Sequence, residues 1–286
     1  MKVVTIATDL ENTFLRRLLA PSCASLGFEL EILHPNERWK SFADKRPAMI
    51  RYLAQLPPDE LLIFTDAYDT VFVRGPDHVA AAHAALGGRI AFSAEPNCWP
   101  LGVLGFALYG QRAAGTCAYL NSGGFIGRAG ELLELYHRYP TAPADRFELL
   151  RNLKTHGFDA NHQFGWSDQY YWTLVHLLEP ETVALDRDTT LFECHVPLIP
   201  NVVVPQVMKD VAEVQRLGRA SPAYHKELPR LVADLQEQRR SAHLHFASSV
   251  SKLVVGALLD EGGLPPWIAR VLEPQTGSGA PRIHEL

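Results

Sequence analysis

Two aspartates placed three positions apart are the residues of this sequence best suited to chemistry. Asp66 and Asp69 follow the apolar run 61–64, with Tyr68 between them. Carboxylate oxygens are the ligands that hard divalent cations such as Mg²⁺ and Mn²⁺ prefer. On a continuing strand the two side chains would point to opposite faces, but both converge if the strand ends near Thr65 and the chain turns. The pattern then predicts a metal site completed by substrate phosphates. The alternative for an isolated D-x-x-D motif is that one aspartate caps a helix and the other is a solvated turn residue, with no metal bound.

These carboxylates follow the third of a series of strands that alternate with helices. The run 3–7 predicts a first strand, a helix capped within 9–12 follows, and 28–33 predicts a second strand. A helix around 49–56 then leads to the strand at 61–65. Such alternation predicts an α/β fold with a parallel sheet. Open sheets of this kind bind ligands at their carboxyl edge, where the two aspartates would lie.

The rest of the chain continues the pattern less regularly. Further strands are predicted at 89–93, 119–127, 182–185 and 190–193, and further helices at 76–86, 130–139, 170–178 and 226–240. The Gly-rich stretch 100–118 is predicted to be a loop. The Gly/Pro/Ser-rich segment 273–286 is predicted to be a mobile tail, which leaves a single domain over residues 1–272.

Other polar and aromatic residues are expected at the same edge of the sheet. Glu95 and Trp99 lie just past the fourth strand. The strand 119–127 is interrupted by Asn121-Ser122-Gly123-Gly124, which predicts a bulge or a close approach of backbone or ligand. It does not match G-x-G-x-x-G, so a dinucleotide site of the Rossmann type loses its main support. Asp168 stands at the start of a helix, where it or Ser167 can also serve as the cap.

Composition limits the classes of function and partner. A net charge of −5 disfavours a nucleic-acid binder. No apolar stretch approaches the roughly 20 residues of a membrane helix, and the first residues lack the apolar core of a signal peptide. The four cysteines are scattered without a C-x-x-C pair, which is typical of free thiols in a reducing compartment. We therefore expect a cytoplasmic protein with no membrane partner.

Four ordered motifs resemble a known family. The runs IFTDAYDTVF, FSAEPNCWP, YLNSGGFIG and SDQYYWT are similar to the glycosyltransferase module of procollagen galactosyltransferases and lysyl hydroxylases (the PLOD type). The resemblance is good over residues 60–175 and weaker outside them. It implies a GT-A-like fold with a mixed, mainly parallel central sheet flanked by helices, which binds a nucleotide sugar. It also implies a metal held by the D-x-x-D motif and a histidine near the C-terminus.

The resemblance assigns roles to individual residues. Asp66 and Asp69 would bind Mn²⁺ (or Mg²⁺), with His245 preferred to His243 as the third ligand. Tyr68 would stack on the uracil, Lys45 would contact the nucleotide, and Lys252 would bind the diphosphate. Thr65, Glu95 and Trp99 would also contact the donor nucleotide or sugar. Residues near the donor sugar and the acceptor would be Asn121, Asp168 and Gln169. The segment 245–252 lacks the glycines of the family's pattern, which leaves the diphosphate contact open.

Together these observations predict a metal-dependent transfer of a hexose, glucose or galactose, from a UDP-sugar to a hydroxyl acceptor, hydroxylysine-linked or another glycan. A divalent ion and a lysine would neutralise the charge that develops on the UDP leaving group. If transfer inverts the anomeric configuration, Asp168 would be the general base. If transfer retains the configuration, the leaving phosphate itself would be the base. The resemblance favours retention for glucosyl transfer. A non-catalytic nucleotide-sugar or carbohydrate-binding domain is the main alternative. An aspartate-dependent phosphatase is disfavoured, because its carboxylates stand two positions apart.

Overall fold

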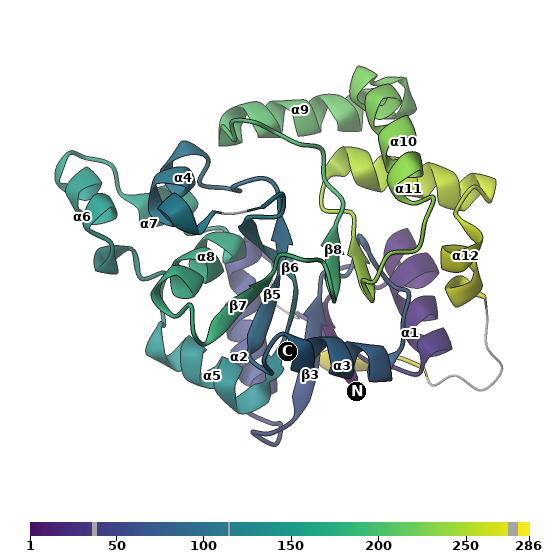
Figure 1. Ribbon diagram of the computed structural model, residues 1–286, viewed down its shortest axis with the longest axis horizontal. Coiled ribbons are helices and arrows are strands. Elements are labelled where there is room, and N and C mark those ends of the chain that lie inside the picture. Colours follow the sequence, from purple (N-terminus) through teal and green to yellow (C-terminus); the bar gives the residue numbers. More distant parts are fainter. Residues whose placement is uncertain (36–38, 114, 274–279) are drawn as a thin grey trace.

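A seven-stranded sheet forms the centre of the computed structural model, which describes residues 1–35, 39–113, 115–273 and 280–286. The strand order is β10-β2-β1-β3-β6-β5-β7, of which Figure 1 labels β3, β6, β5 and β7. The strands are β1 Lys2–Ile6, β2 Glu29–His34, β3 Leu61–Thr65, β5 Ile90–Glu95, β6 Tyr119–Arg128, β7 Val183–Asp186 and β10 Arg282–Glu285. Neighbours pair in parallel except at β6, which runs antiparallel to both β3 and β5. The sheet is therefore mixed and mainly parallel.

Helices cover both faces of this sheet because its inner strands are apolar on both sides. On β3, Leu62 and Phe64 face the core that contains α2, α5 and α8, whereas Ile63 faces the core that contains α1 and α3. These helices are α1 Ala20–Leu26, α2 Lys45–Leu53, α3 Pro76–Ala85, α5 Ala129–Arg138 and α8 Asp168–Leu178. The predicted α/β class, with a mixed, mainly parallel central sheet flanked by helices, is confirmed.

A second, smaller sheet lies beside the first and carries part of the site. It consists of β4 Thr70–Phe72, β9 His243–His245 and β8 Phe192–Cys194, in the order β4-β9-β8. Its outer side packs into a separate core with three C-terminal helices, α10 Pro222–Asp234, α11 Ser249–Glu261 and α12 Pro266–Leu272. In sequence β9 is far from β4, so their pairing joins two distant parts of the chain.

The predicted loop 100–118 contains a helix, α4 Val103–Tyr109. Glycine lowers helix propensity, and Gly102, Gly105 and Gly110 hide the signal in the sequence. Gly105 is needed by the packing, because a Cβ at this position would lie 2.1 Å from Sγ of Cys98. The helix is therefore stabilised by tertiary contacts that local sequence does not reveal.

The predicted mobile tail 273–286 includes residues 274–279, which lie outside the described residues. Its last part is not a tail in the structure, because Arg282–Glu285 forms β10 and pairs in parallel with β2. His284 contacts the buried carboxylate of Glu31, and its ring packs edge-on against Tyr52. These contacts are made with residues far away in sequence, so the polar composition of the segment was misleading.

The remaining helices are shorter or peripheral: α6 Glu148–Thr155, α7 Ala160–Phe164 and α9 Val204–Leu217, with single turns at Leu15–Leu19, Phe42–Asp44, Gly110–Arg112, Ala144–Arg146 and Gly218–Ala220. The helix predicted at 226–240 begins earlier, because Oγ of Ser221 accepts the backbone N–H of Tyr224 and Pro222 follows the cap. Within the described part of the chain, no helix is long and apolar enough to cross a membrane.

Candidate metal centre

Asp66 is placed by the end of β3. The strand runs to Thr65, and the backbone N–H of Asp66 then bonds to the carbonyl of Gly123 on β6 at 2.9 Å. This last bond fixes the point at which the chain leaves the sheet. Because β3 is parallel to β1, Asp66 lies at the carboxyl edge, where the sequence places it.

Asp69 and His245 are brought together by the small sheet. Thr70, the first residue of β4, pairs with His245, the last residue of β9. The backbone N–H of Phe246 also bonds to the carbonyl of Asp69 at 2.8 Å. Two backbone contacts therefore hold the histidine beside the second carboxylate.

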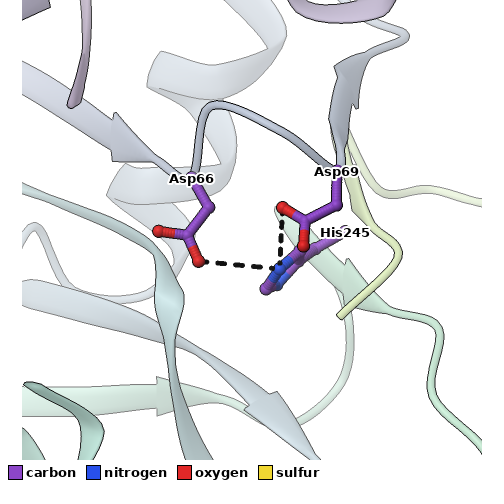
Figure 2. Close-up of side chains that lie close together, drawn as sticks. All are labelled: Asp66, Asp69 and His245. Atoms are coloured by element: carbon purple, nitrogen blue, oxygen red, sulfur yellow. Dashed lines mark ion pairs between the residues drawn. The ribbon is translucent and has the colours of Figure 1, made fainter. Parts of the chain in front are cut away.

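The three side chains converge on one point. Figure 2 shows the carboxylates of Asp66 and Asp69, at the two ends of a short loop, both turned toward the ring of His245. Nε2 of His245 lies 3.4 Å from Oδ1 of Asp69 and 3.9 Å from Oδ2 of Asp66. One ligand atom from each residue lies within 4.8 Å of the other two. Asp66 and Asp69 therefore do not point to opposite sides of the sheet.

The other oxygen of each carboxylate is bound by a lysine. Nζ of Lys45 lies 2.6 Å from Oδ1 of Asp66, and Nζ of Lys252 lies 3.2 Å from Oδ2 of Asp69. The oxygens that face His245 are left for another partner, and Oδ1 of Asp69 is buried without a hydrogen bond among the described residues. Two carboxylates in this arrangement present one free oxygen each to the same space.

Protonation of the cluster follows from these neighbours in the metal-free protein. Burial alone would raise the pKa of Asp69, but Lys252 and His245 outweigh it and hold the pKa below the usual range. Burial would likewise lower the pKa of His245, but the carboxylate of Asp69 outweighs it and raises the pKa. For Lys45, burial is again outweighed, mainly by Asp66, and its pKa is raised. Asp69 therefore stays ionised, which a metal ligand requires.

Asn121 orients the imidazole of His245. Oδ1 of Asn121 accepts the backbone N–H of Gly123 at 2.9 Å, which identifies it as the amide oxygen. The same atom lies 3.1 Å from Nδ1 of His245, so Nδ1 carries the proton. In the neutral ring, the form that metal binding requires, Nε2 offers its lone pair to the space between the carboxylates, as in metal sites whose histidines are held by an outer hydrogen bond.

Asn121 is part of a buried network with two further residues singled out in the sequence. Oε1 of Glu95 accepts hydrogen bonds from Nδ2 of Asn121 at 2.9 Å and from Nε2 of Gln169 at 2.7 Å. Gln169 also donates to the carbonyl of Trp99 at 3.1 Å, and its oxygen accepts the backbone N–H of Ser122 at 3.3 Å. The contacts of Gln169 and Glu95 thus favour a positioning role, behind the groups that face the substrate.

His243 occupies a different environment from His245. It is fully buried, with Nε2 at 2.7 Å from Oγ1 of Thr65. Its ring packs edge-on between Phe72 and Phe192. The hydroxyl of Thr65 also bonds to Thr70, so this buried residue joins β3 to the small sheet. These contacts do not favour the nucleotide-binding role predicted for Thr65.

The glycines of the strand 119–127 make room for aromatic rings of the small sheet. A Cβ on Gly123 would lie 2.1 Å from Cε1 of His245, and one on Gly124 would lie 2.9 Å from Cδ1 of Phe192. The pairing of β5 with β6 also shifts at this point, from Phe92 opposite Phe125 to Ser93 opposite Asn121. The sequence predicts a bulge or a close approach here, and the structure contains both.

Asp168 and Tyr68 flank the ligand cluster. Asp168 is the first residue of α8, whose cap is Ser167. Its carboxylate is buried, and Oδ1 has no hydrogen-bond partner among the described residues. Burial raises the pKa of Asp168 to about 6, with Lys45 opposing. Tyr68 is half-buried, and its hydroxyl accepts a hydrogen bond from the backbone N–H of Asp9 at 2.6 Å, which ties the ring to the segment that follows β1.

The donor set fits a divalent ion. Two carboxylate oxygens and one neutral imidazole nitrogen suit Mn²⁺ or Mg²⁺, since hard ions take oxygen ligands and imidazole suits several divalent metals. The buried Oδ1 of Asp69 has no hydrogen bond among the described residues, and a cation bound there would compensate its charge. Sequence reasoning found these residues and predicted a close approach at Gly123, but not that the neighbour there is the ring of His245.

Comparison with known proteins adds relatives. Residues 1–146 match a family model described as the PLOD GT domain. The chain is 29% identical over 146 residues to procollagen-lysine,2-oxoglutarate 5-dioxygenase of Drosophila melanogaster, covering 47% of this chain and 20% of that protein. It is 26% identical over 206 residues to procollagen-lysine,2-oxoglutarate 5-dioxygenase 1 of Gallus gallus, covering 67% and 25%. For the multifunctional procollagen lysine hydroxylase and glycosyltransferase LH3 of Homo sapiens, identity is 28% over 147 residues, covering 48% and 19%.

The chain thus spans about a fifth to a quarter of the length of these relatives. Among solved structures, the glycosyltransferase GlyE of Streptococcus pneumoniae TIGR4 matches 94% of this chain and 61% of its own, at 12% identity and a TM-score of 0.38. A TM-score this low carries no argument about the site.

Proposed function

Because the chain belongs to the family of PLOD glycosyltransferase (GT) domains, we propose that it transfers a hexose, glucose or galactose, from a UDP-sugar to a hydroxyl acceptor with the help of a divalent metal. The family makes the chain a glycosyltransferase. The donor, the metal and the hexose are the proposal, and one observation supports the metal. Free oxygens of Asp66 and Asp69 and Nε2 of His245 converge, while a lysine binds the opposite oxygen of each carboxylate.

A metal at this site would be held by Asp66, Asp69 and His245. Bound there, Mn²⁺ or Mg²⁺ would act as a Lewis acid on the diphosphate of the donor. Lys252 stands in the first turn of α11, where a helix N-terminus also favours an anion. Its ammonium would therefore meet the negative charge that develops on the leaving UDP.

The remaining residues would bind and orient the donor. The ring of Tyr68 would stack on the uracil, held in place by the bond of its hydroxyl to Asp9. The unpartnered Oδ1 of Asp168 would accept a hydrogen bond from a sugar or acceptor hydroxyl. With a pKa of about 6, Asp168 is mostly ionised near neutral pH and would serve as the base if configuration inverts. If the configuration is retained, the carboxylate of Asp168 would only orient hydroxyls.

Release of UDP tests this proposal against a domain that only binds nucleotide sugars. We expect the protein to release UDP from UDP-glucose or UDP-galactose in the presence of Mn²⁺, and to lose that activity in EDTA. Asp66→Asn and Asp69→Asn should each abolish the release. Mn²⁺-dependent binding of UDP without any release would favour the non-catalytic alternative. If UDP neither binds nor is released, both the transferase and the non-catalytic alternative are refuted.

The cytoplasmic location stays a prediction. All four cysteines are free in the structure, as a reducing compartment requires. Fractionation of cells that express the chain would test it.

A further inference from the structure

The first turn of α11 is held from behind by a buried chain of hydrogen bonds. Oγ of Ser248, the cap of α11, accepts a hydrogen bond from the backbone N–H of Ser251 at 3.0 Å. The hydroxyl of Ser248 donates to Oγ of Ser251 at 2.8 Å, and the hydroxyl of Ser251 donates to Oε1 of Glu227 on α10 at 2.6 Å. Arg230 binds both carboxylate oxygens of Glu227, through Nη2 and Nε. We call these four residues, Ser248, Ser251, Glu227 and Arg230, the serine–glutamate anchor.

The serine–glutamate anchor lies between α10 and α11, which are in contact (Figure 1). Ser251 is 0% exposed and Glu227 is 3% exposed. A buried carboxylate loses its hydration, and a two-pronged arginine together with a hydroxyl compensates that loss. Replacing a buried ion pair by apolar residues is often neutral for stability, so stability alone does not account for Glu227 at this place. The direct consequence of these bonds is one fixed position of the first turn of α11 against α10.

Lys252 follows Ser251 directly and points in another direction. Nζ of Lys252 lies 3.2 Å from Oδ2 of Asp69, and the lysine side chain is 35% exposed. Successive residues of a helix lie roughly 100° apart around its axis, so one can be anchored in the interior while the next reaches the candidate metal centre. A rotation or fraying of this turn would therefore move the ammonium of Lys252 away from its place beside Asp69.

The segment that joins His245 to α11 depends on the same anchor. The backbone N–H of Phe246 bonds to the carbonyl of Asp69 at 2.8 Å, and the backbone N–H of Ser248 bonds to the carbonyl of Phe246 at 2.8 Å. Residues 245–252 lack the glycines of the family's pattern and contain three serines. Because two of these serines belong to the serine–glutamate anchor, side-chain hydrogen bonds set the path of this segment between the metal ligand and Lys252.

We propose that Ser251 and Glu227 are positioning residues for the donor: through the first turn of α11 they hold the ammonium of Lys252 where the diphosphate of a UDP-sugar binds. Neither residue touches the donor. A cation that is already in place loses less conformational entropy on binding, because a free lysine side chain must first be ordered. The inference rests on the function proposed above, whose UDP-sugar supplies the diphosphate. Of these residues, the sequence prediction assigned only Lys252.

Calorimetry on the full chain with UDP and with UMP, both in the presence of Mn²⁺, tests the inference. UMP lacks the terminal phosphate that Lys252 would meet. Ser251→Ala should weaken UDP binding roughly three- to ten-fold and UMP binding less than about two-fold, because only part of one charge-assisted hydrogen bond is lost. Lys252→Met, which removes the ammonium, should weaken UDP binding roughly ten- to hundred-fold. Equal weakening of UDP and UMP by Ser251→Ala would overturn the inference.

A double variant shows whether Ser251 acts through Lys252. Once the ammonium is gone, adding Ser251→Ala to Lys252→Met should weaken UDP binding less than about two-fold further. A further loss as large as in the wild-type background would overturn the inference, because Ser251 would then act by another route.

Glu227 is tested by a conservative variant. Glu227→Gln keeps an acceptor oxygen for the hydroxyl of Ser251, whereas Glu227→Ala removes it. We therefore expect Glu227→Gln to retain more of the UDP affinity than Glu227→Ala, with UMP affinity nearly the same in both. The reverse order for UDP would contradict a role through Ser251. Because Ser251→Ala removes a single hydroxyl, it tests the inference even if Glu227→Ala does not fold.

Ser241 supplies a matched control. It is a buried serine, 1% exposed, whose hydroxyl donates to a buried glutamate, Glu193, at 2.7 Å. That glutamate also binds an arginine, Arg239, at 2.8 Å. Ser241→Ala should lower the melting temperature in EDTA about as much as Ser251→Ala does, and leave the preference for UDP over UMP unchanged. An equal loss of that preference in both variants would be an effect of stability and would overturn the inference.

Failure of the proposed function looks different. Release of UDP from UDP-glucose and UDP-galactose by the wild type is measured in the same preparation. If the wild type releases UDP and Ser251→Ala keeps the wild-type preference for UDP over UMP, only the inference about positioning fails. If UDP binds and neither donor is cleaved, the transferase proposal fails, and the comparison of UDP with UMP still decides the role of Ser251. If UDP does not bind at all, both fail.

Discussion

Replacing each of the two histidines of β9 by alanine should separate metal binding from stability. His245→Ala removes one of three converging ligand atoms. Loss of an outer-shell partner alone commonly costs about 10–100-fold in metal affinity, so loss of the ligand should cost at least about 100-fold. His243→Ala instead removes a fully buried ring and its 2.7 Å bond to Thr65. That change should cost about 2–3 kcal/mol of unfolding free energy and leave metal affinity near the wild-type value.

The assay has two readings for each variant. The Mn²⁺ concentration that supports half-maximal UDP release gives the metal effect, and melting in EDTA gives the stability of the metal-free protein. A loss of 2–3 kcal/mol corresponds to a melting temperature lower by roughly 5–10 °C. His245→Ala should lower it by less than half as much, because the vacated space borders Asp66, whose side chain is 27% exposed, and water can enter. The reverse ranking on both readings would refute the assignment of His245 as the ligand.

Three further changes probe the site from other sides. Gly123→Ala should weaken Mn²⁺ binding in calorimetry, because the new Cβ would lie 2.1 Å from Cε1 of His245; an unchanged affinity would contradict the packing argument. Burial raises the pKa of Glu95 from 4.5 to about 7, so the unfolded chain loses this proton first and stability should fall as pH rises from 4.5 to 7. In urea unfolding with EDTA, Glu95→Gln should reduce this loss of unfolding free energy by up to about 3 kcal/mol, and an equal dependence on pH in the variant and the wild type would refute the reasoning. Tyr68→Ala should weaken UDP roughly ten- to hundred-fold in calorimetry and Tyr68→Phe far less, as stacking is worth ~1–3 kcal/mol; equal losses would instead point to the hydroxyl bond to Asp9.

The sequence predicts those parts of the fold that local pattern controls. The apolar run 61–64 predicts β3 and its end at Thr65, and β-α-β alternation predicts parallel pairing with β1. Antiparallel β6 has no local signal, because its direction depends on pairing with β3 and β5. The strand β10 was missed for a similar reason, since Glu31 and β2 stabilise it from the other end of the chain.

The site was predictable in its residues more than in its geometry. The spacing of Asp66 and Asp69 points to a metal, but H-L-H cannot tell His245 from His243 without the pairing of β4 with β9. The lysines that bind the outer carboxylate oxygens were assigned to the nucleotide from the resemblance alone. Their pairing with the two aspartates depends on how α2 and α11 pack, which no short motif encodes.

Anomalous diffraction from crystals grown with Mn²⁺ and UDP would test the central claim most directly. The account predicts one strong manganese peak within roughly 2.5 Å of Oδ2 of Asp66, Oδ1 of Asp69 and Nε2 of His245, with the diphosphate of UDP beside it and Lys252 within reach. A manganese peak elsewhere on the protein, or UDP bound with no metal among these three side chains, would contradict it.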